Sequence, residues 1–231
     1  MYEGYFLSLY KHGYGILKSE NRIKIGLFYK NDLKFGKIIT KDWITEGEFN
    51  MGLKDGYIIE YDRLKRIDFE GQYKDGKKEG IGFSYYHNGN ISYKGYFRNN
   101  LVDIFGFIYN SSGKLFYAGH INKGQRKGFG IYYAYDQNGR KLYQYSGNWV
   151  NDDCIDGYLL KKFADGNYFF GYTKMFVYQT FLKYKLGNII YTGETKMSST
   201  EREGYGEIIY PDGKIKKGIF INNILVLEDN K

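Results

Sequence analysis

The side chains that could perform chemistry in this 231-residue chain are few and follow no common pattern. His12, His87 and His120 stand in unrelated local contexts, and the single cysteine, Cys154, has no histidine at a metal-ligand spacing. A nucleophile, a general base or a zinc site would each need several such groups brought together. We therefore expect no enzymatic activity, no metal and no cofactor.

Two short segments begin like ligand-binding loops but lack the residues that define them. The segment Asp152–Gly157 starts as a calcium loop, yet Cys154 occupies the third ligand position and Phe163 stands where the closing Glu is required. Gly128-Phe129-Gly130 has the glycine spacing of a phosphate loop, but no Gly-Lys-Ser/Thr follows it. Turns explain both segments better.

The composition favours strands and turns. The chain contains 27 Tyr, 17 Phe, 31 Gly and one Pro, and its hydrophobic content of 42% is too high for a disordered chain. Aromatic side chains suit a pleated, half-buried surface, and glycines permit tight turns. The formal net charge of +8 favours acidic partners, namely anionic lipid, acidic protein tails or nucleic acid.

Cysteine usage and the absence of long apolar runs bear on location. One cysteine cannot form an internal disulfide, which favours a reducing compartment. The sequence contains no apolar run of the roughly 18 residues that a membrane-spanning helix needs. A regular pattern already starts at Tyr2 and leaves no room for a signal peptide. These observations predict a cytoplasmic protein.

A glycine recurs along the whole chain at intervals of 21 to 28 residues. In the reference unit, Phe69–Gly89, an aromatic residue stands at position 1, the recurring glycine at position 3 and a second aromatic residue at position 5. Ten units start near residues 2, 24, 45, 69, 93, 117, 145, 169, 191 and 216. This near-constant spacing predicts a repeat architecture in which each unit contacts only its neighbours.

The recurring glycine has a packing explanation. In a strand, positions 1, 3 and 5 point to one face, so the glycine leaves bare backbone between two rings. We expect a ring from the adjoining strand to lie across this bare patch. Glycine costs a strand about 0.5–1 kcal/mol, whereas burying most of one ring returns about 1.5–3 kcal/mol. The net free energy therefore favours the aromatic–glycine–aromatic pattern.

The second half of each unit begins near paired glycines, such as Gly80 and Gly82, and ends at a turn signal such as Asn88-Gly89. Each unit is therefore expected to contain two short strands and two turns. The eighth unit, from Phe169, lacks the paired glycines, and we expect irregular geometry there. The tenth unit loses the pattern after Phe220 and is expected to contribute at most one strand.

This unit resembles the MORN repeat (membrane occupation and recognition nexus). The likeness is closest at Phe69–Gly89, Tyr117–Gly139 and Tyr2–Gly15, and it extends over nearly the whole chain. The resemblance implies an all-β fold, namely an elongated single-layer antiparallel sheet of about nine to ten consecutive β-hairpins with a shallow groove. Residues 1–231 would form a single domain.

The resemblance also implies a function. Similar repeats occur in radial-spoke heads of cilia, in junctional membrane proteins and in the cytoskeleton of protists. They imply a non-enzymatic scaffold that binds other proteins in a multi-subunit complex. The heavy use of Lys, Asn, Ile and Tyr is typical of an AT-rich genome, which favours a cilium or a protist cytoskeleton. Open strand edges would favour edge-strand or end-to-end association.

Two sets of residues are candidates for binding. Rings of the regular middle units would line the groove: Tyr73, Tyr93, Phe97, Tyr117 and Trp149. These rings have an equally good structural interpretation, in which they only hold the sheet together. Paired basic residues would form one edge: Lys77, Lys78, Arg126 and Lys127. This edge would bind anionic phospholipid or an acidic polypeptide, unless it is merely solvated surface.

Nucleic acid is disfavoured as a partner. A platform for single strands needs exposed rings that alternate with Lys or Arg. The rings of this chain instead repeat at positions that the fold itself requires.

Overall fold

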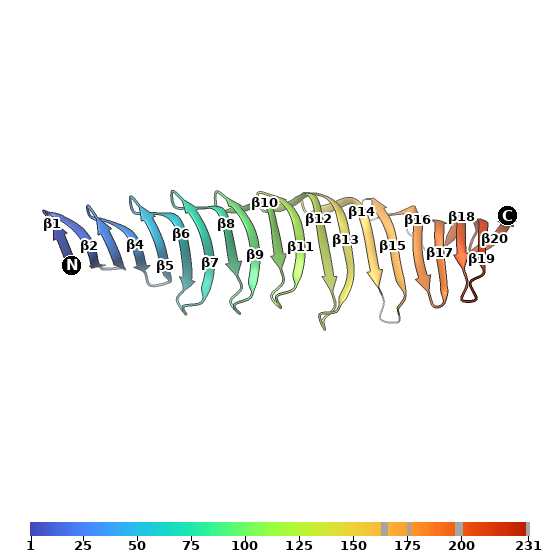
Figure 1. The fold of residues 1–231 in the computed structure, drawn as a ribbon, viewed down its shortest axis with the longest axis horizontal. Helices are drawn as coiled ribbons and strands as arrows, with labels where there is room; N and C mark the ends of the chain where they lie inside the picture. The colour runs from blue at the N-terminus through green and yellow to red at the C-terminus, as the bar shows by residue number, and fades with distance from the viewer. Residues whose placement is uncertain (163–165, 175–176, 197–200, 230–231) are drawn as a thin grey trace. The chain divides into compact units, whose positions relative to one another are not determined.

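The computed structural model describes residues 1–162, 166–174, 177–196 and 201–229. These residues contain 20 β-strands, which belong to one antiparallel sheet (Figure 1). Within the described part of the chain, no helix has the length and apolar character needed to cross a membrane. The structure thus confirms the predicted all-β class.

The strands follow one another in short succession. The first ten are β1 (Tyr2–Leu7), β2 (Tyr10–Ser19), β3 (Arg22–Tyr29), β4 (Asp32–Ile39), β5 (Trp43–Asn50), β6 (Leu53–Asp62), β7 (Ile67–Lys74), β8 (Lys77–Tyr85), β9 (Ile91–Arg98) and β10 (Leu101–Tyr109). The others are β11 (Leu115–Asn122), β12 (Gln125–Tyr135), β13 (Lys141–Val150), β14 (Asp153–Lys162), β15 (Tyr168–Lys174), β16 (Val177–Leu186), β17 (Ile189–Thr195), β18 (Arg202–Ile209), β19 (Ile215–Ile221) and β20 (Ile224–Glu228).

The chain divides into two compact units. The first unit comprises residues 1–115 and 121–124, and the second comprises residues 116–120 and 125–231. In the first unit, consecutive strands pair antiparallel from β1 to β10. In the second unit, the same pattern runs from β12 to β20. Both units therefore consist of consecutive hairpins, as the sequence predicts.

The tenth repeat contains two strands, so the expectation of at most one is wrong. Strand β20 pairs with β19, for example through Ile221 and Ile224. The turn between them, Asn222-Asn223, has φ values of 50° and 70°. Two central residues with positive φ make the type I′ turn that suits a tight hairpin. Asparagine tolerates this conformation as glycine does, so turn signals that depend on glycine do not identify this turn.

A turn of this kind also holds its own hairpin against the preceding one. Asn99 and Asn100 have φ values of 50° and 70° and join β9 to β10. The Asn100 backbone N–H donates to the Lys78 carbonyl over 3.1 Å, and the Asn100 Oδ1 accepts from the Lys78 N–H over 2.8 Å. Each turn thereby fixes the position of the hairpin before it.

The recurring glycines lie side by side across the sheet. In β7–β10 the register pairs Gly71 with Gly82, Gly82 with Gly95, and Gly95 with Gly106. A Cβ atom at Gly106 would lie 2.4 Å from the ring of Tyr93. That ring comes from position 1 of its own strand and covers the glycine of its strand and that of the next strand. The ring was expected from the adjoining strand, but adjacent glycines let one ring cover both.

The core of each unit is a ladder of rings. The position-1 ring packs edge-to-face on the position-5 ring of its own repeat, as Phe69 does on Tyr73 with centroids 5.6 Å apart. It packs in the same way on the position-5 ring of the next repeat, as Phe69 does on Phe97 at 5.1 Å. Edge-to-face pairs add about 0.5–1.5 kcal/mol each to the burial of the rings. This alternating contact joins neighbouring hairpins.

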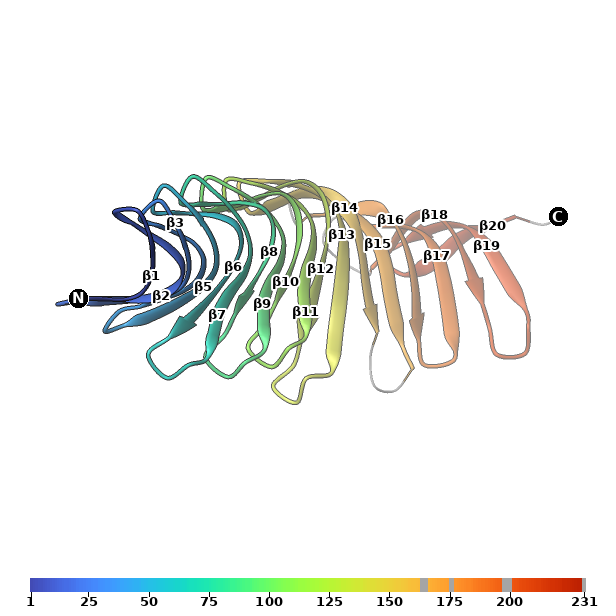
Figure 2. The same ribbon diagram turned by 60° about the vertical axis from the view of Figure 1, so that its left-hand side comes forward.

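The strands are curved (Figure 2). Between the pairs Gly71–Gly82 and Tyr73–Lys78, strand β8 contains two more residues than β7. One of them, Gly80, has a φ of 100°. Extra residues of this kind form a β-bulge, which bends a strand. The first glycine of each predicted pair therefore lies in the bulge, and the second lies beneath the ring that covers it.

The glycine row is interrupted once in the first unit, at Ile58, and over β14–β16 in the second, where Gly171 pairs with Leu159 and with Leu182. Ile58 pairs with Gly47 and with Gly71, and its side chain is fully buried. The repeat at Gly47 has Thr45 instead of a ring at position 1, so the isoleucine fills the free space. In the eighth repeat the buried Leu182 pairs with Gly171 in the same way.

Candidate functional site

The five rings proposed to line a groove are buried in the core. Their exposed fractions are 0% for Tyr117, 4% for Phe97 and Trp149, and 5% for Tyr73 and Tyr93. The Tyr117 hydroxyl donates to the His120 carbonyl over 2.9 Å, and burial raises its pKa to about 12. This placement favours the interpretation that these rings hold the sheet together.

The four residues of the predicted basic edge fall into two classes. Lys77 and Lys127 are exposed, whereas Lys78 and Arg126 turn inward over the rings. The Lys78 ammonium lies 3.9 Å from the centroid of Phe69, and burial lowers its pKa. Only one residue of each pair therefore presents its charge fully to solvent.

Arg126 is held by several contacts. Its guanidinium lies 4.3 Å from the ring centroid of Trp149. Its Nε lies 3.0 Å from a carboxylate oxygen of Asp152, and its Nη2 donates to the Asp152 carbonyl over 2.9 Å. The alkyl part of such a side chain covers apolar surface while its charge stays paired.

Sequence reasoning missed three further cations in the same structural position. Lys11 lies 5.7 Å from the ring of Tyr2, Lys54 lies 5.0 Å from Tyr73, and Arg202 lies 5.8 Å from Tyr191. Each of these cations precedes a bulge glycine by two residues, as do Lys78 and Arg126. A basic residue two positions before that glycine is therefore the sequence signal for an inward cation–π contact.

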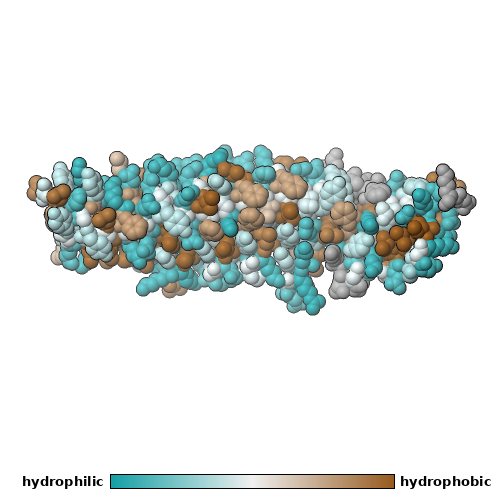
Figure 3. Space-filling view, viewed as in Figure 1, coloured by the Kyte–Doolittle hydropathy of each residue, from teal (hydrophilic) through white to brown (hydrophobic). Residues whose placement is uncertain are grey.

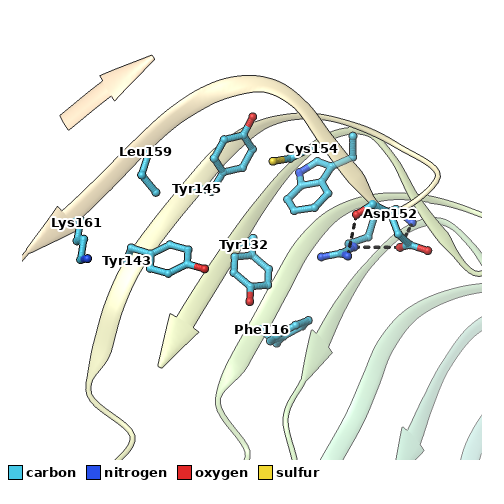
Figure 4. A pocket seen from close by; sticks show the side chains of 10 residues that line it. Phe116, Tyr132, Tyr143, Tyr145, Asp152, Cys154, Leu159 and Lys161 are labelled. Atoms are coloured by element: carbon cyan, nitrogen blue, oxygen red, sulfur yellow. Dashed lines mark hydrogen bonds and ion pairs between the residues drawn. The ribbon is translucent and has the colours of Figure 1, made fainter. Parts of the chain in front are cut away.

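A cavity of about 490 Å³ opens in the second unit (Figure 4). Its lining residues are Phe116, Arg126, Tyr132, Tyr143, Tyr145, Trp149, Asp152, Cys154, Leu159 and Lys161. Lys161 lies at one end and Asp152 at the other, with the rings between them (Figure 4). The sequence pattern did not identify this site, because most of its rings stand outside positions 1 and 5.

The described residues provide no metal-binding set. No group of three or more His, Cys, Asp or Glu side chains is placed there to hold a metal ion. Cys154 is buried, and burial raises the pKa of its thiol, whereas a reactive cysteine needs a lowered pKa. Phe163, the closing position of the rejected calcium loop, lies outside the described residues.

Apolar side chains are exposed on the face opposite the ring ladder. They alternate with the glycine row along the strands and therefore point the other way. They are Tyr14, Leu27 and Phe35 in β2–β4, Ile81, Tyr96 and Phe105 in β8–β10, and Tyr205, Ile219 and Leu227 in β18–β20. Their exposed fractions range from 40% to 68%. We call this set the outer apolar row.

Members of the outer apolar row adjoin one another. Tyr14 pairs with Leu27, which pairs with Phe35. In the second unit, Tyr205 pairs with Ile219. A space-filling view likewise shows apolar patches between hydrophilic side chains on one face of the molecule (Figure 3).

Comparison with known families agrees with the observed hairpins. A family model described as the MORN repeat matches residues 46–57, 69–91, 117–139 and 199–215. Two of these stretches start at the position-1 residues Phe69 and Tyr117, where the sequence pattern is most regular. No curated protein matches the chain.

Proposed function

Because this chain is a MORN-repeat protein, we propose that it is a non-enzymatic scaffold that binds other proteins in a stable multi-subunit assembly. MORN repeats are generally protein- or membrane-binding repeats. Their core rings are occupied with one another in this chain, which leaves the outer surface and the cavity for partners.

The outer apolar row is the observation that carries this proposal. Large contiguous apolar patches on a protein surface commonly mark an interaction site. Here Tyr14, Leu27 and Phe35 form one such patch, with exposed fractions of 68%, 51% and 57%. Hydrogen bonds between Asn31, in the turn after β3, and Lys11, in β2, hold these strands in a fixed order. The patch therefore suits a partner that contacts several hairpins at once.

The setting that we propose is the cytoplasm, within a ciliary axoneme (a radial spoke or a neighbouring complex) or a protist cytoskeleton. Two features support this setting: the likeness of the repeats to those of radial-spoke and cytoskeletal proteins, and a composition rich in Lys, Asn, Ile and Tyr. Edge-strand association between copies would be compatible with such an assembly.

Binding to anionic phospholipid is the second candidate function. The net charge of +8 and the exposed Lys77 and Lys127 support it. The inward positions of Lys78 and Arg126 weaken it, because two of the four predicted charges are directed into the sheet.

Co-purification from a native source tests the scaffold proposal. The double variant Leu27→Lys/Phe35→Lys would place two charges in the apolar patch. Leu9→Lys is the matched control, since Leu9 is 91% exposed but lies in a turn outside the row. We expect the double variant to lose the partner proteins and the control to retain them, at equal melting temperatures. Retention by both proteins would refute the proposed surface.

A vesicle experiment separates the lipid function. Phosphatidylcholine vesicles with and without phosphoinositide would be sedimented with the protein at physiological salt. Binding that needs phosphoinositide and is abolished by Lys77→Ala/Lys127→Ala would favour lipid. An absence of binding would remove lipid as a partner and leave the scaffold proposal unchanged.

A further inference from the structure

In the cavity of the second unit, a small residue stands opposite a buried ring. In most other repeats the cross-strand partner of the position-5 ring is longer, as Leu33 is opposite Phe28, although Val102 stands opposite Phe97. In the seventh repeat, Trp149 pairs with Cys154. The cysteine side chain ends well short of the space that leucine or lysine would fill. The remaining volume, about 490 Å³, lies in the range of small-ligand sites.

The chemistry of the walls narrows the choice of occupant. The floor is aromatic and aliphatic: Phe116, Tyr132, Tyr143, Tyr145, Trp149 and Leu159. Arg126 and Lys161 contribute two positive charges to the lining, and Asp152 contributes one negative charge. The lining thus combines apolar walls with a net positive charge.

We propose that this cavity is a docking pocket for an acidic segment of a partner protein, which inserts one aromatic side chain. An inserted ring would pack against the ring edges of the wall, as the chain's own rings do. A flanking Asp or Glu residue would face Lys161 at one end, whereas the other end holds the Arg126–Asp152 ion pair. A basic segment would meet the like charge of Lys161 and be disfavoured.

This inference rests on the scaffold function and specifies the chemistry of one partner. Interfaces commonly depend on one aromatic anchor that fills a pocket. The cavity in this unit is such a pocket, and it lies where the repeat departs from its pattern.

Tryptophan fluorescence tests the proposal directly. The chain has two tryptophans, so Trp43→Phe leaves Trp149 in the cavity wall as the only reporter. The probe is the capped peptide Gly-Glu-Asp-Phe-Glu-Asp-Gly. Two control peptides replace its Phe by Ala or its acidic residues by Lys. We expect a saturable change in emission with the probe and at least about tenfold weaker binding of both controls, the size of one anchor contact.

Two variants connect binding to the cavity. Cys154→Leu supplies the residue that Leu33 supplies in the second repeat and should weaken probe binding at least about tenfold, with the melting temperature kept or raised. Cys154→Ala keeps the space open and should keep the affinity. Lys161→Glu, which leaves the aromatic walls in place, should weaken binding of the acidic probe and favour the Lys-containing control peptide.

Several results would overturn the pocket. Equal probe binding by Cys154→Leu and the parent protein would exclude the cavity as the site, and equal binding of the Ala peptide would exclude the aromatic anchor. Binding of N-acetylphenylalaninamide as tight as that of the probe would indicate a small-molecule site instead. If native partners bind the parent protein and Cys154→Leu equally, the pocket fails while the scaffold function stands. If the parent protein binds no partner, the scaffold function itself fails.

Discussion

Replacing Gly130 by alanine should displace the ring of Tyr117 from the core. A Cβ atom at this position would lie 2.2, 2.4 and 2.5 Å from the Oη, Cζ and Cε2 atoms of that ring. These distances are far shorter than a van der Waals contact, so the ring must move. Gly130 does not have a positive φ, and alanine therefore fits the backbone. The clash alone determines the cost.

The structure gives the size of the effect. Tyr117 is completely buried, and losing that burial costs about 1.5–3 kcal/mol. Its edge-to-face contact with Trp149, at 5.5 Å, contributes about 0.5–1.5 kcal/mol, and its hydrogen bond to His120 about 1 kcal/mol. Alanine returns about 0.5–1 kcal/mol of strand propensity. The net loss should be about 2–5 kcal/mol.

Urea denaturation and thermal melting measure this loss. For a chain of this length, it should lower the melting temperature by about 10 °C. Gly124→Ala is the matched control, because a Cβ atom there meets nothing within 4 Å and only its φ of 88° opposes alanine. That control should cost about 1–2 kcal/mol.

A double variant isolates the clash. Tyr117→Ala removes the ring, and Gly130→Ala should then cost almost nothing further. The third repeat illustrates the same compensation, with Thr45 at position 1 and Ile58 in the glycine row. A loss below 1 kcal/mol for Gly130→Ala alone would refute the idea that these glycines exist to seat rings.

The remaining predictions concern cations, turns and pH. Arg126→Ala should lower the free energy of unfolding measured with urea by about 1–2 kcal/mol, because it removes a ring contact and an ion pair. Lys127 is exposed, so Lys127→Ala should change stability by less than about 0.5 kcal/mol. Equal effects of the two substitutions would contradict the inward position of Arg126. Asn100→Ala should lower the free energy of unfolding by about 1–2 kcal/mol, since it removes both a residue that tolerates a φ of 70° and the acceptor for the Lys78 N–H. Asn100→Gly should recover part of this loss. Equal stabilities of the two variants would refute the role of φ in this turn. Stability should fall as the pH rises above about 10, because tyrosines of the unfolded chain ionise there while Tyr117 keeps its proton up to about 12, so that the unfolded state binds fewer protons. Each such tyrosine contributes about 1.4 kcal/mol per pH unit, and Tyr117→Phe should reduce the slope measured by alkaline denaturation; an unchanged slope would contradict the burial of this hydroxyl.

Much of the architecture was accessible from the spacing of residue types. The Phe69–Gly71–Tyr73 pattern predicted strands, hairpins and the covering of glycine by rings, because side chains alternate strictly along a strand. The pattern did not predict which ring covers which glycine. That depends on register across two strands, which aligns Gly71 with Gly82 and is set by the turns.

The candidate sites were less accessible. Lys77 and Lys78 look equivalent in the sequence, yet only one of them folds over a ring, since a bulge decides the direction of each side chain. The sequence analysis did not identify the cavity beside Trp149, because the volume of a cavity depends on the sizes and positions of all the side chains around it. Cys154 was visible only as an isolated thiol.

The sequence by itself determined the repeat, the all-β class and the position of the ring ladder, because these follow from local alternation and from a period of about two dozen residues. Tertiary structure decided which rings are buried, which cations face solvent and where a cavity opens. Those properties depend on contacts between residues from different hairpins, such as the covering of Trp149 by Arg126. No single repeat contains the information for such a contact, since each hairpin completes its packing only against its neighbour.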